Sequence, residues 1–154
     1  MPLIDWLDKY NINIKEIGDQ HKRLAEIINK FYESLQANKS DKNLNKILDD
    51  LLAESVLHFT REETIMILYK YPGYDAVKEE HDILSNELTN IFRRENENKE
   101  DKFTKIAFFL RDWLIDHIFK DDLKLGKYLK EKGVTYKTEN KLTNGIFFVA
   151  SFPK

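Results

Sequence analysis

The sequence predicts an all-α protein that folds as an up-down-up-down antiparallel four-helix bundle. Apolar residues recur at steps of three and four in four separate stretches, which is the period of one helix face. Short polar or Pro-Gly breaks separate these stretches, and short connections favour antiparallel packing of neighbouring helices. The first 130 residues contain no run of alternating apolar and polar residues, so no strand is expected there.

The predicted elements follow from the positions of these apolar residues and breaks. They are an extended N-terminal arm over 1–18, a helix from Asp19, a second helix from about Asp41 to Tyr69, a third after Pro72-Gly73, a loop over 93–102, and a fourth helix from Phe103 to about Asp122. A short apolar-periodic piece around Leu125 follows, and Gly133 ends it. We therefore expect a bundle domain over 1–132 and a tail over 133–154. Asn144-Gly145 predicts a hairpin or an extended strap in this C-terminal extension, with no function assigned to it.

Composition excludes several classes of function. A net charge of −2 favours neither nucleic acid nor an acidic membrane surface as a partner. The chain has no cysteine, which excludes disulfides, thiolate metal sites and cysteine catalysis. No signal peptide begins the sequence, and no apolar run approaches the roughly 20 residues that span a bilayer. A cytoplasmic protein is expected.

The four histidines carry the functional signal. A single histidine on an apolar helix face is by itself typical of a hydrogen-bonded core residue. Here, however, each histidine lies on the apolar face of a different element: His21, His58, His81 and His117. Two carboxylates lie close to them, because Glu62 follows His58 by four residues and Asp122 follows His117 by five. Burying these carboxylates without compensation would cost several kcal/mol each, so the pattern predicts a bound cation.

The residue types narrow the identity of the metal. Imidazoles with carboxylates and no thiolate suit iron, and also manganese or zinc. Ferritin-like di-iron bundles place a glutamate three residues before each ligand histidine. The residues at those positions here are Gly18, Ser55, Lys78 and Leu114, none of which is acidic. The ferritin-like class is therefore set aside.

From Trp6 to about Leu129 the chain resembles the bacterial hemerythrins. The residues that carry the resemblance are Asp19-Gln20-His21-Lys22-Arg23-Leu24, His58-Phe59-x-x-Glu62-Glu63-x-x-Met66, Tyr71-Pro72-Gly73-Tyr74, Glu80-His81 and Trp113-Leu114-x-x-His117-Ile118-x-x-x-Asp122. The resemblance implies two non-haem iron ions joined by an oxo or hydroxo bridge and two carboxylates. It implies that His21 and His58 bind one iron, that His81 and His117 bind the other, and that Glu62 and Asp122 bridge them.

Two positions depart from the family pattern. Gly18 replaces an acidic residue, and Asp19 is expected to take over its capping role. The larger departure is Val77, which stands one turn before His81 where the family has a further histidine and which cannot bind metal. Tyr74, a further turn back, is the nearest donor on the same helix face. The iron next to His81 and His117 is therefore expected to be more weakly held and more open.

The resemblance implies reversible binding of O₂, for carriage, storage or sensing, and a binding protein more than an enzyme. The open position beside Val77 keeps a second function in view, an oxidase or a protein that reacts with peroxide or nitric oxide. A third interpretation is a metal-depleted bundle with a structural or interaction role. The five-residue step from His117 to Asp122 does not keep one face of a regular helix, so the helix should loosen or end there.

Overall fold

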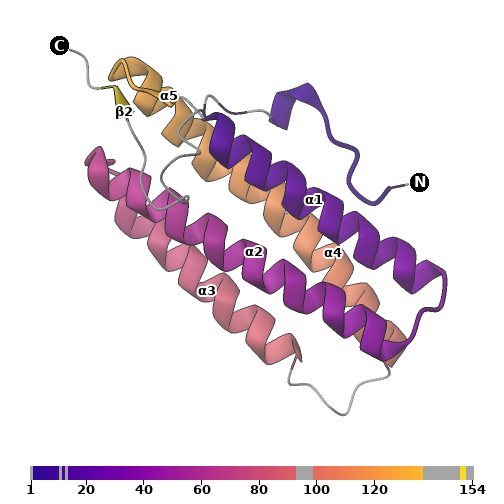
Figure 1. Ribbon diagram of the computed structural model, residues 1–154. Coiled ribbons are helices and arrows are strands. Elements are labelled where there is room, and N and C mark those ends of the chain that lie inside the picture. The colour runs from indigo at the N-terminus through magenta and orange to yellow at the C-terminus, as the bar shows by residue number, and fades with distance from the viewer. Residues whose placement is uncertain (1, 11, 13, 93–98, 137–149, 152–154) are drawn as a thin grey trace.

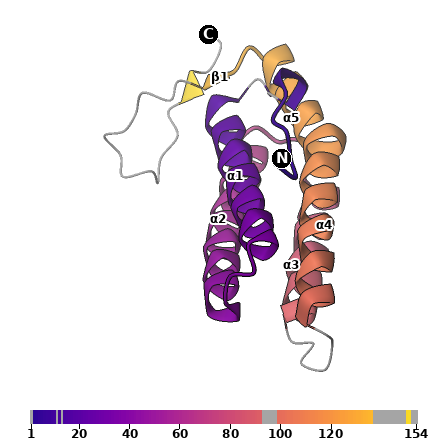
Figure 2. The same ribbon diagram turned by 90° about the vertical axis from the view of Figure 1, so that its right-hand side faces the viewer.

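Four long helices lie side by side in the computed structural model, which describes residues 2–10, 12, 14–92, 99–136 and 150–151 (Figures 1 and 2). They are α1 (Lys15–Gln36), α2 (Asp41–Leu68), α3 (Tyr74–Phe92) and α4 (Lys99–His117). Helix α1 packs against both α2 and α4, and α2 packs against α3. Short connections join α1 to α2 and α2 to α3. The predicted all-α four-helix bundle is confirmed.

The breaks between helices have clear local causes. Asn38 adopts a positive φ of 52° after α1, and the Ser40 hydroxyl then caps α2 by accepting a hydrogen bond from the Asn43 backbone N–H at 3.2 Å. Between α2 and α3, a Cβ at Gly73 would lie 2.7 Å from the Tyr71 ring, so only glycine fits beside that ring without rearrangement. These breaks reverse the chain twice and set the antiparallel order.

The end of α4 differs from a regular helix. Residues Ile118–Asp122 form a π-helical turn, labelled η2, and α5 (Leu123–Glu131) continues from it. A π-turn bonds residues five apart, which places His117 and Asp122 on one face. The predicted loosening is thus confirmed, and the chain remains helical until Gly133, which has a φ of 70°.

Two predicted helix starts are wrong by four residues. Helix α1 begins at Lys15 instead of Asp19, because Ile14 and Ile17 pack fully buried and hold its first turn despite the absence of a side-chain cap at Ile14. Helix α4 begins at Lys99 instead of Phe103. Its first turn is charged in sequence and carries no apolar signal. Residues 93–98 of the predicted loop lie outside the described part of the chain.

The N-terminal arm lies against the bundle, as predicted. It contains one short 3-10 turn, η1 (Asp8–Tyr10). The side chain of Asn29 on α1 holds the arm through two hydrogen bonds, accepting from the Ile4 N–H at 2.7 Å and donating to the Ile4 carbonyl at 2.8 Å. Tyr10 then packs edge-on against Phe119 of η2, with ring centroids 5.4 Å apart. The arm therefore contacts both α1 and the π-turn.

Buried apolar side chains form two clusters. The larger cluster contains residues of all four helices and the arm, including Leu24, Leu84 and Leu114. The smaller cluster contains Ile14, Ile17, Ile65, Met66, Val77, Leu125, Leu129 and Val134. On α1 and α3 a histidine stands between a residue of the small cluster and one of the large cluster: Ile17, His21 and Leu24 on α1, and Val77, His81 and Leu84 on α3. A polar layer therefore separates the two clusters.

Two short strands follow α5. β1 (Thr135–Tyr136) pairs antiparallel with β2 (Ala150–Ser151), with Thr135 opposite Ser151. The pairing brings the chain back after residues 137–149, as a hairpin requires. The predicted turn at Asn144-Gly145 lies outside the described residues.

Candidate metal centre

The polar layer contains all six residues predicted to bind metal. They come from every helix of the bundle: His21 from α1, His58 and Glu62 from α2, His81 from α3, His117 from α4 and Asp122 from η2. Each is at most 3% exposed. Five of the six bring one ligating atom each within 4.8 Å of the others, namely His21, His58, Glu62, His117 and Asp122. His81 stands at the edge of this group, with Nε2 3.6 Å from Oε1 of Glu62.

The two carboxylates each contact histidines from different helices. Oε2 of Glu62 lies 2.9 Å from Nε2 of His58, while its other oxygen, Oε1, faces His81. Oδ2 of Asp122 lies 2.5 Å from Nε2 of His21 and 2.8 Å from Nε2 of His117. Both carboxylates therefore lie between histidines, which is the arrangement that a bridging ligand requires.

The electrostatics of the layer centre on His117. Burial and the neighbouring His58 and His117 rings hold the pKa of His21 well below its ordinary value, so His21 is neutral. Burial also opposes protonation of His117, but the Asp122 and Glu62 carboxylates raise its pKa well above the ordinary value. Burial acts to raise the pKa of Asp122, and His117 overcomes this and lowers it. In the protein alone, a proton on His117 thus supplies the positive charge between two carboxylates.

That proton leaves much of the polar layer unsatisfied. Among the described residues, several buried atoms make no hydrogen bond of regular geometry, even where another ligand atom lies close: Nδ1 and Nε2 of His21, Oε1 of Glu62, Nε2 of His81 and both carboxylate oxygens of Asp122. Buried polar groups are normally hydrogen-bonded, and leaving them unpaired costs free energy. These nitrogen and oxygen atoms are ligand types for a divalent transition metal. The residues present therefore fit a cation in this layer.

Three further residues, for which the sequence predicted no role, each contact the Nδ1 atom of a histidine. We call Nδ1 the outer ring nitrogen and Nε2 the inner one. Nδ1 of His58 donates to Oε1 of Gln20 at 3.0 Å, and Nδ1 of His81 donates to Oε1 of Glu63 at 2.8 Å. Oδ2 of Asp121 lies 3.5 Å from Nδ1 of His117. A proton held on Nδ1 leaves the Nε2 lone pair of His58 and His81 free for a metal.

Each of the three stands next to a predicted ligand in the sequence, and Asp121 is also one helical turn from the histidine that it contacts. Aromatic rings fix two of the histidines from the side. Phe59 stacks on His81 with centroids 4.1 Å apart and planes at 18°. Trp113 stacks on His117 with centroids 5.3 Å apart and planes at 16°. These contacts restrict rotation of both imidazoles and orient their inner nitrogens toward the polar layer.

Residues 13–129 match the family model "Hemerythrin HHE cation binding domain". The chain belongs to the hemerythrin family. The sequence resemblance is thus confirmed by a match that includes all six residues of the polar layer.

Hemerythrin relatives are similar along most of their length. A bacteriohemerythrin of Methylococcus capsulatus is 31% identical over 131 residues, which cover 84% of this chain and 98% of the relative. A bacteriohemerythrin of Pseudomonas aeruginosa is 30% identical over 117 residues, covering 76% of this chain and 75% of the relative. A crystal structure of wild-type hemerythrin superimposes with a TM-score of 0.72 at 32% identity, over 81% of this chain and 96% of that one.

Within this hemerythrin fold, Val77 is 4% exposed and packs in the small apolar cluster with Ile65 and Met66. Tyr74 packs on the same cluster. The phenol of Tyr71 senses the charges of the polar layer. Burial raises its pKa, and the negative charges of Asp121, Asp122 and Glu62 raise it further. Helix spacing points to Tyr74 and not to Tyr71, because Tyr71 lies before α3 and shares no helix face with His81.

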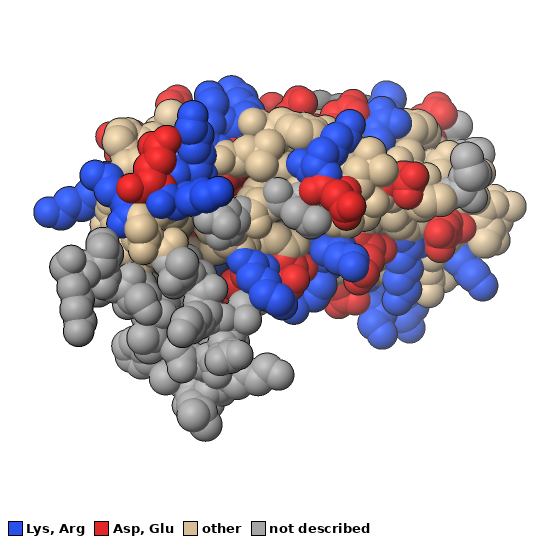
Figure 3. All heavy atoms as spheres, turned by 90° about the horizontal axis from the view of Figure 1, so that it is seen from above, with Lys and Arg blue, Asp and Glu red and all other residues tan. Residues whose placement is uncertain are grey.

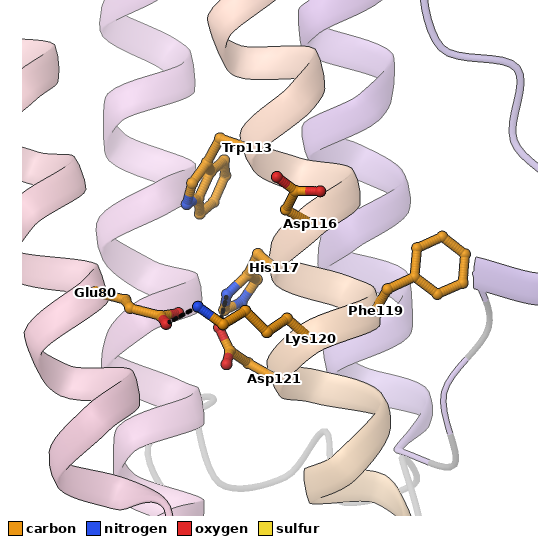
Figure 4. Close-up of a pocket in the computed structure, with 7 residues that line it drawn as sticks. All are labelled: Glu80, Trp113, Asp116, His117, Phe119, Lys120 and Asp121. Carbon is orange, nitrogen blue, oxygen red and sulfur yellow. Dashed lines mark hydrogen bonds and ion pairs between the residues drawn. The ribbon is translucent and has the colours of Figure 1, made fainter.

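A pocket of about 500 Å³ adjoins the His117 side of the hemerythrin centre (Figure 4). Its lining consists of Glu80, Trp113, Asp116, His117, Phe119, Lys120 and Asp121. The Lys120 ammonium crosses from η2 to the Glu80 carboxylate of α3 at 2.8 Å (Figure 4). Small molecules in this pocket would therefore lie beside His117, the one predicted ligand in its lining.

The surface of this hemerythrin shows no single-sign field on the face seen in Figure 3, where acidic and basic side chains alternate. Among the described residues, no helix combines the length and apolar character needed to cross a membrane.

Proposed function

We propose that this protein binds O₂ at a non-haem di-iron centre held by the polar layer. The observation that carries the proposal is the set of buried imidazole and carboxylate atoms that face one another without hydrogen-bond partners. Such a set is costly in a protein without an ion and favourable in one that holds it. The similarity to proteins named bacteriohemerythrin supports iron and O₂ over other divalent metals and ligands.

The contacts support a division of the ligands into two sets. Asp122 lies between His21 and His117, and Glu62 lies between His58 and His81. We assign His21 and His58 to one ion and His81 and His117 to the other, with Glu62 and Asp122 bridging. We assign this activity to residues 1–132 and none to 133–154.

When bound, the two ferrous ions supply electrons to O₂ and recover them when O₂ leaves. The protein must exclude water and protons, because these promote irreversible oxidation. The apolar clusters on either side of the layer serve this purpose, with Leu24, Leu84 and Leu114 on one side and Ile17, Ile65 and Met66 on the other. The stacked rings of Phe59 and Trp113 add to the apolar wall beside His81 and His117.

One observation favours a second function, reduction of peroxide or reaction with nitric oxide. Val77 offers no ligand atom beside His81, and the pocket lined by His117 adjoins the same side of the centre. A more accessible metal ion on this side would react with small oxidants in addition to O₂. The two functions differ in outcome, because reversible binding returns O₂ and a reaction consumes the oxidant.

Iron stoichiometry tests the proposed centre. The wild-type protein, freed of metal and then reloaded with Fe²⁺ without air, is expected to hold about two iron ions per chain. His58→Ala should lower the stoichiometry, whereas Asn45→Ala on the exposed face of α2 should leave it unchanged. Equal iron content in wild type and His58→Ala would contradict the assignment.

A further inference from the structure

The outer nitrogens of the histidines are not all backed by the same chemistry. His81 and His117 face carboxylates, with Glu63 at 2.8 Å from Nδ1 of His81 and Asp121 at 3.5 Å from Nδ1 of His117. His58 instead faces the neutral amide of Gln20 at 3.0 Å, and Nδ1 of His21 has no hydrogen-bond partner among the described residues. The anionic partners thus lie on one side of the centre, which is the side of Val77.

This difference changes how strongly an imidazole donates to a metal. A carboxylate that accepts the outer N–H stabilises positive charge on the ring, fixes its tautomer and makes the inner nitrogen more basic. An amide oxygen fixes the tautomer and orientation but carries no charge. An imidazole backed by a carboxylate is therefore the stronger ligand.

The surroundings of Glu63 suit this role. Its side chain is 18% exposed, so solvent weakens its charge only in part, and His81 is 2% exposed. Phe59 stacks on one face of the His81 ring while Glu63 bonds to its edge, so the ring cannot turn away from Glu63 without losing the stacking contact. Among the described residues, no Lys or Arg forms an ion pair with Glu63. The nearby Lys78 bonds to Asp82, and its pKa is raised first by that bond and then by the charge of Glu63.

We propose that Glu63 is a positioning residue that strengthens His81 as a metal ligand, with Asp121 acting likewise on His117. Together they offset the donor that Val77 does not supply. The inference rests on the proposed division of ligands between two ions. On this proposal, the negative charges of Glu63 and Asp121 keep the second ion bound although one histidine is missing.

Zinc affinity of the metal-free protein tests the proposal without dependence on O₂ chemistry. Glu63→Gln keeps a hydrogen-bond acceptor and removes the charge. We expect it to weaken one of two zinc sites by about tenfold or more, as outer-shell changes do, and to leave the other within about twofold. Gln20→Ala should weaken the other site. Glu79→Gln, an exposed change of equal charge on α3, should alter neither.

A second measurement separates charge from shape. In the iron-loaded protein, Glu63→Gln should raise the reduction potential, because the lost negative charge had favoured the oxidised ions, while the unfolding temperature of the metal-free protein stays within about 2 °C of wild type. Unchanged zinc affinities, or equal weakening of both sites, would overturn the role of Glu63 and leave the proposed centre standing. Failure of the wild-type protein to bind zinc or iron would overturn both.

Discussion

Nε2 of His117 lies 2.8 Å from Oδ2 of Asp122, although the two residues are five apart in the sequence. The π-helical turn over Ile118–Asp122 makes this contact possible. A regular α-helix turns 3.6 residues at a time and would separate the two side chains around the helix. The local departure from α-helical geometry thus brings Asp122 into the polar layer.

Asp122→Asn should destabilise the metal-free protein and also weaken its binding of metal. Oδ2 of the buried Asp122 lies 2.8 Å from Nε2 of His117, and its charge raises the pKa of that ring, so removing the charge should cost the metal-free protein about 1–3 kcal/mol of unfolding free energy. The metal-loaded protein loses a ligand, and the rise in unfolding temperature on adding Zn²⁺ should shrink. Calorimetry with and without zinc measures both effects. Asp112→Asn, an exposed change on α4, is the control. Unchanged stability of the metal-free protein would refute this account of Asp122.

Val77→His should destabilise the metal-free protein and strengthen its binding of metal. Without metal, an imidazole in the apolar cluster of Ile65 and Met66 should cost about 1–3 kcal/mol of unfolding free energy. With metal, the added ligand should strengthen metal binding at the weaker of the two sites. It should also slow the loss of O₂ binding by the iron-loaded protein in air. Metal titration and repeated exposure to O₂ measure the two effects. Val56→His, at a position 53% exposed, should change neither. Two equal, tight metal sites in the wild-type protein would show that Val77 does not weaken metal binding.

Ile14→Ala should destabilise the fold by about 2–5 kcal/mol. Ile14 is fully buried in the small apolar cluster at the first turn of α1, and the truncated side chain leaves a cavity. Denaturant unfolding gives the free energy directly. Ile67→Ala, at a position 60% exposed on α2, should stay within about 0.5 kcal/mol of wild type. Similar effects of the two substitutions would mean that the first turn of α1 is not packed.

Asn29→Ala should release the N-terminal arm. The substitution removes both hydrogen bonds to the Ile4 backbone, for a loss of about 1–2 kcal/mol. Trypsin should then cleave faster after Lys9, which limited proteolysis followed by mass spectrometry detects. Asn45→Ala, in an exposed position of α2, is the control. An unchanged cleavage rate would indicate that packing of Trp6 and Tyr10 alone holds the arm.

The helix pattern and the six polar-layer residues could be predicted from sequence, because they follow from short-range spacing. Steps of three and four reveal the apolar faces, and the histidines on them are few enough to examine one by one. The first turn of α1 was missed because Ile14 has no capping side chain and is stabilised by contacts with residues far along the chain, such as Ile65.

Two of the three partners of the outer histidine nitrogens could not be predicted from sequence, for a related reason. Asp121 is the exception, because it follows His117 by four residues. Gln20 bonds to His58 and Glu63 bonds to His81, so these two partners each act on a histidine of another helix. Spacing within one helix carries no information about such pairs. The position of Tyr71 depends in the same way on how the α2–α3 connection packs against α5, since the ring centroids of Tyr71 and Tyr128 lie 5.2 Å apart.

The most direct test of the central claim is the visible absorption spectrum of the iron-loaded protein through cycles of O₂ and argon. The account predicts about two iron ions per chain and a new absorption band that appears with O₂ and disappears under argon, over several cycles. A protein that holds iron but whose band persists under argon would instead support the oxidant-consuming function. A protein that holds no iron, or whose spectrum does not respond to O₂, would contradict the account.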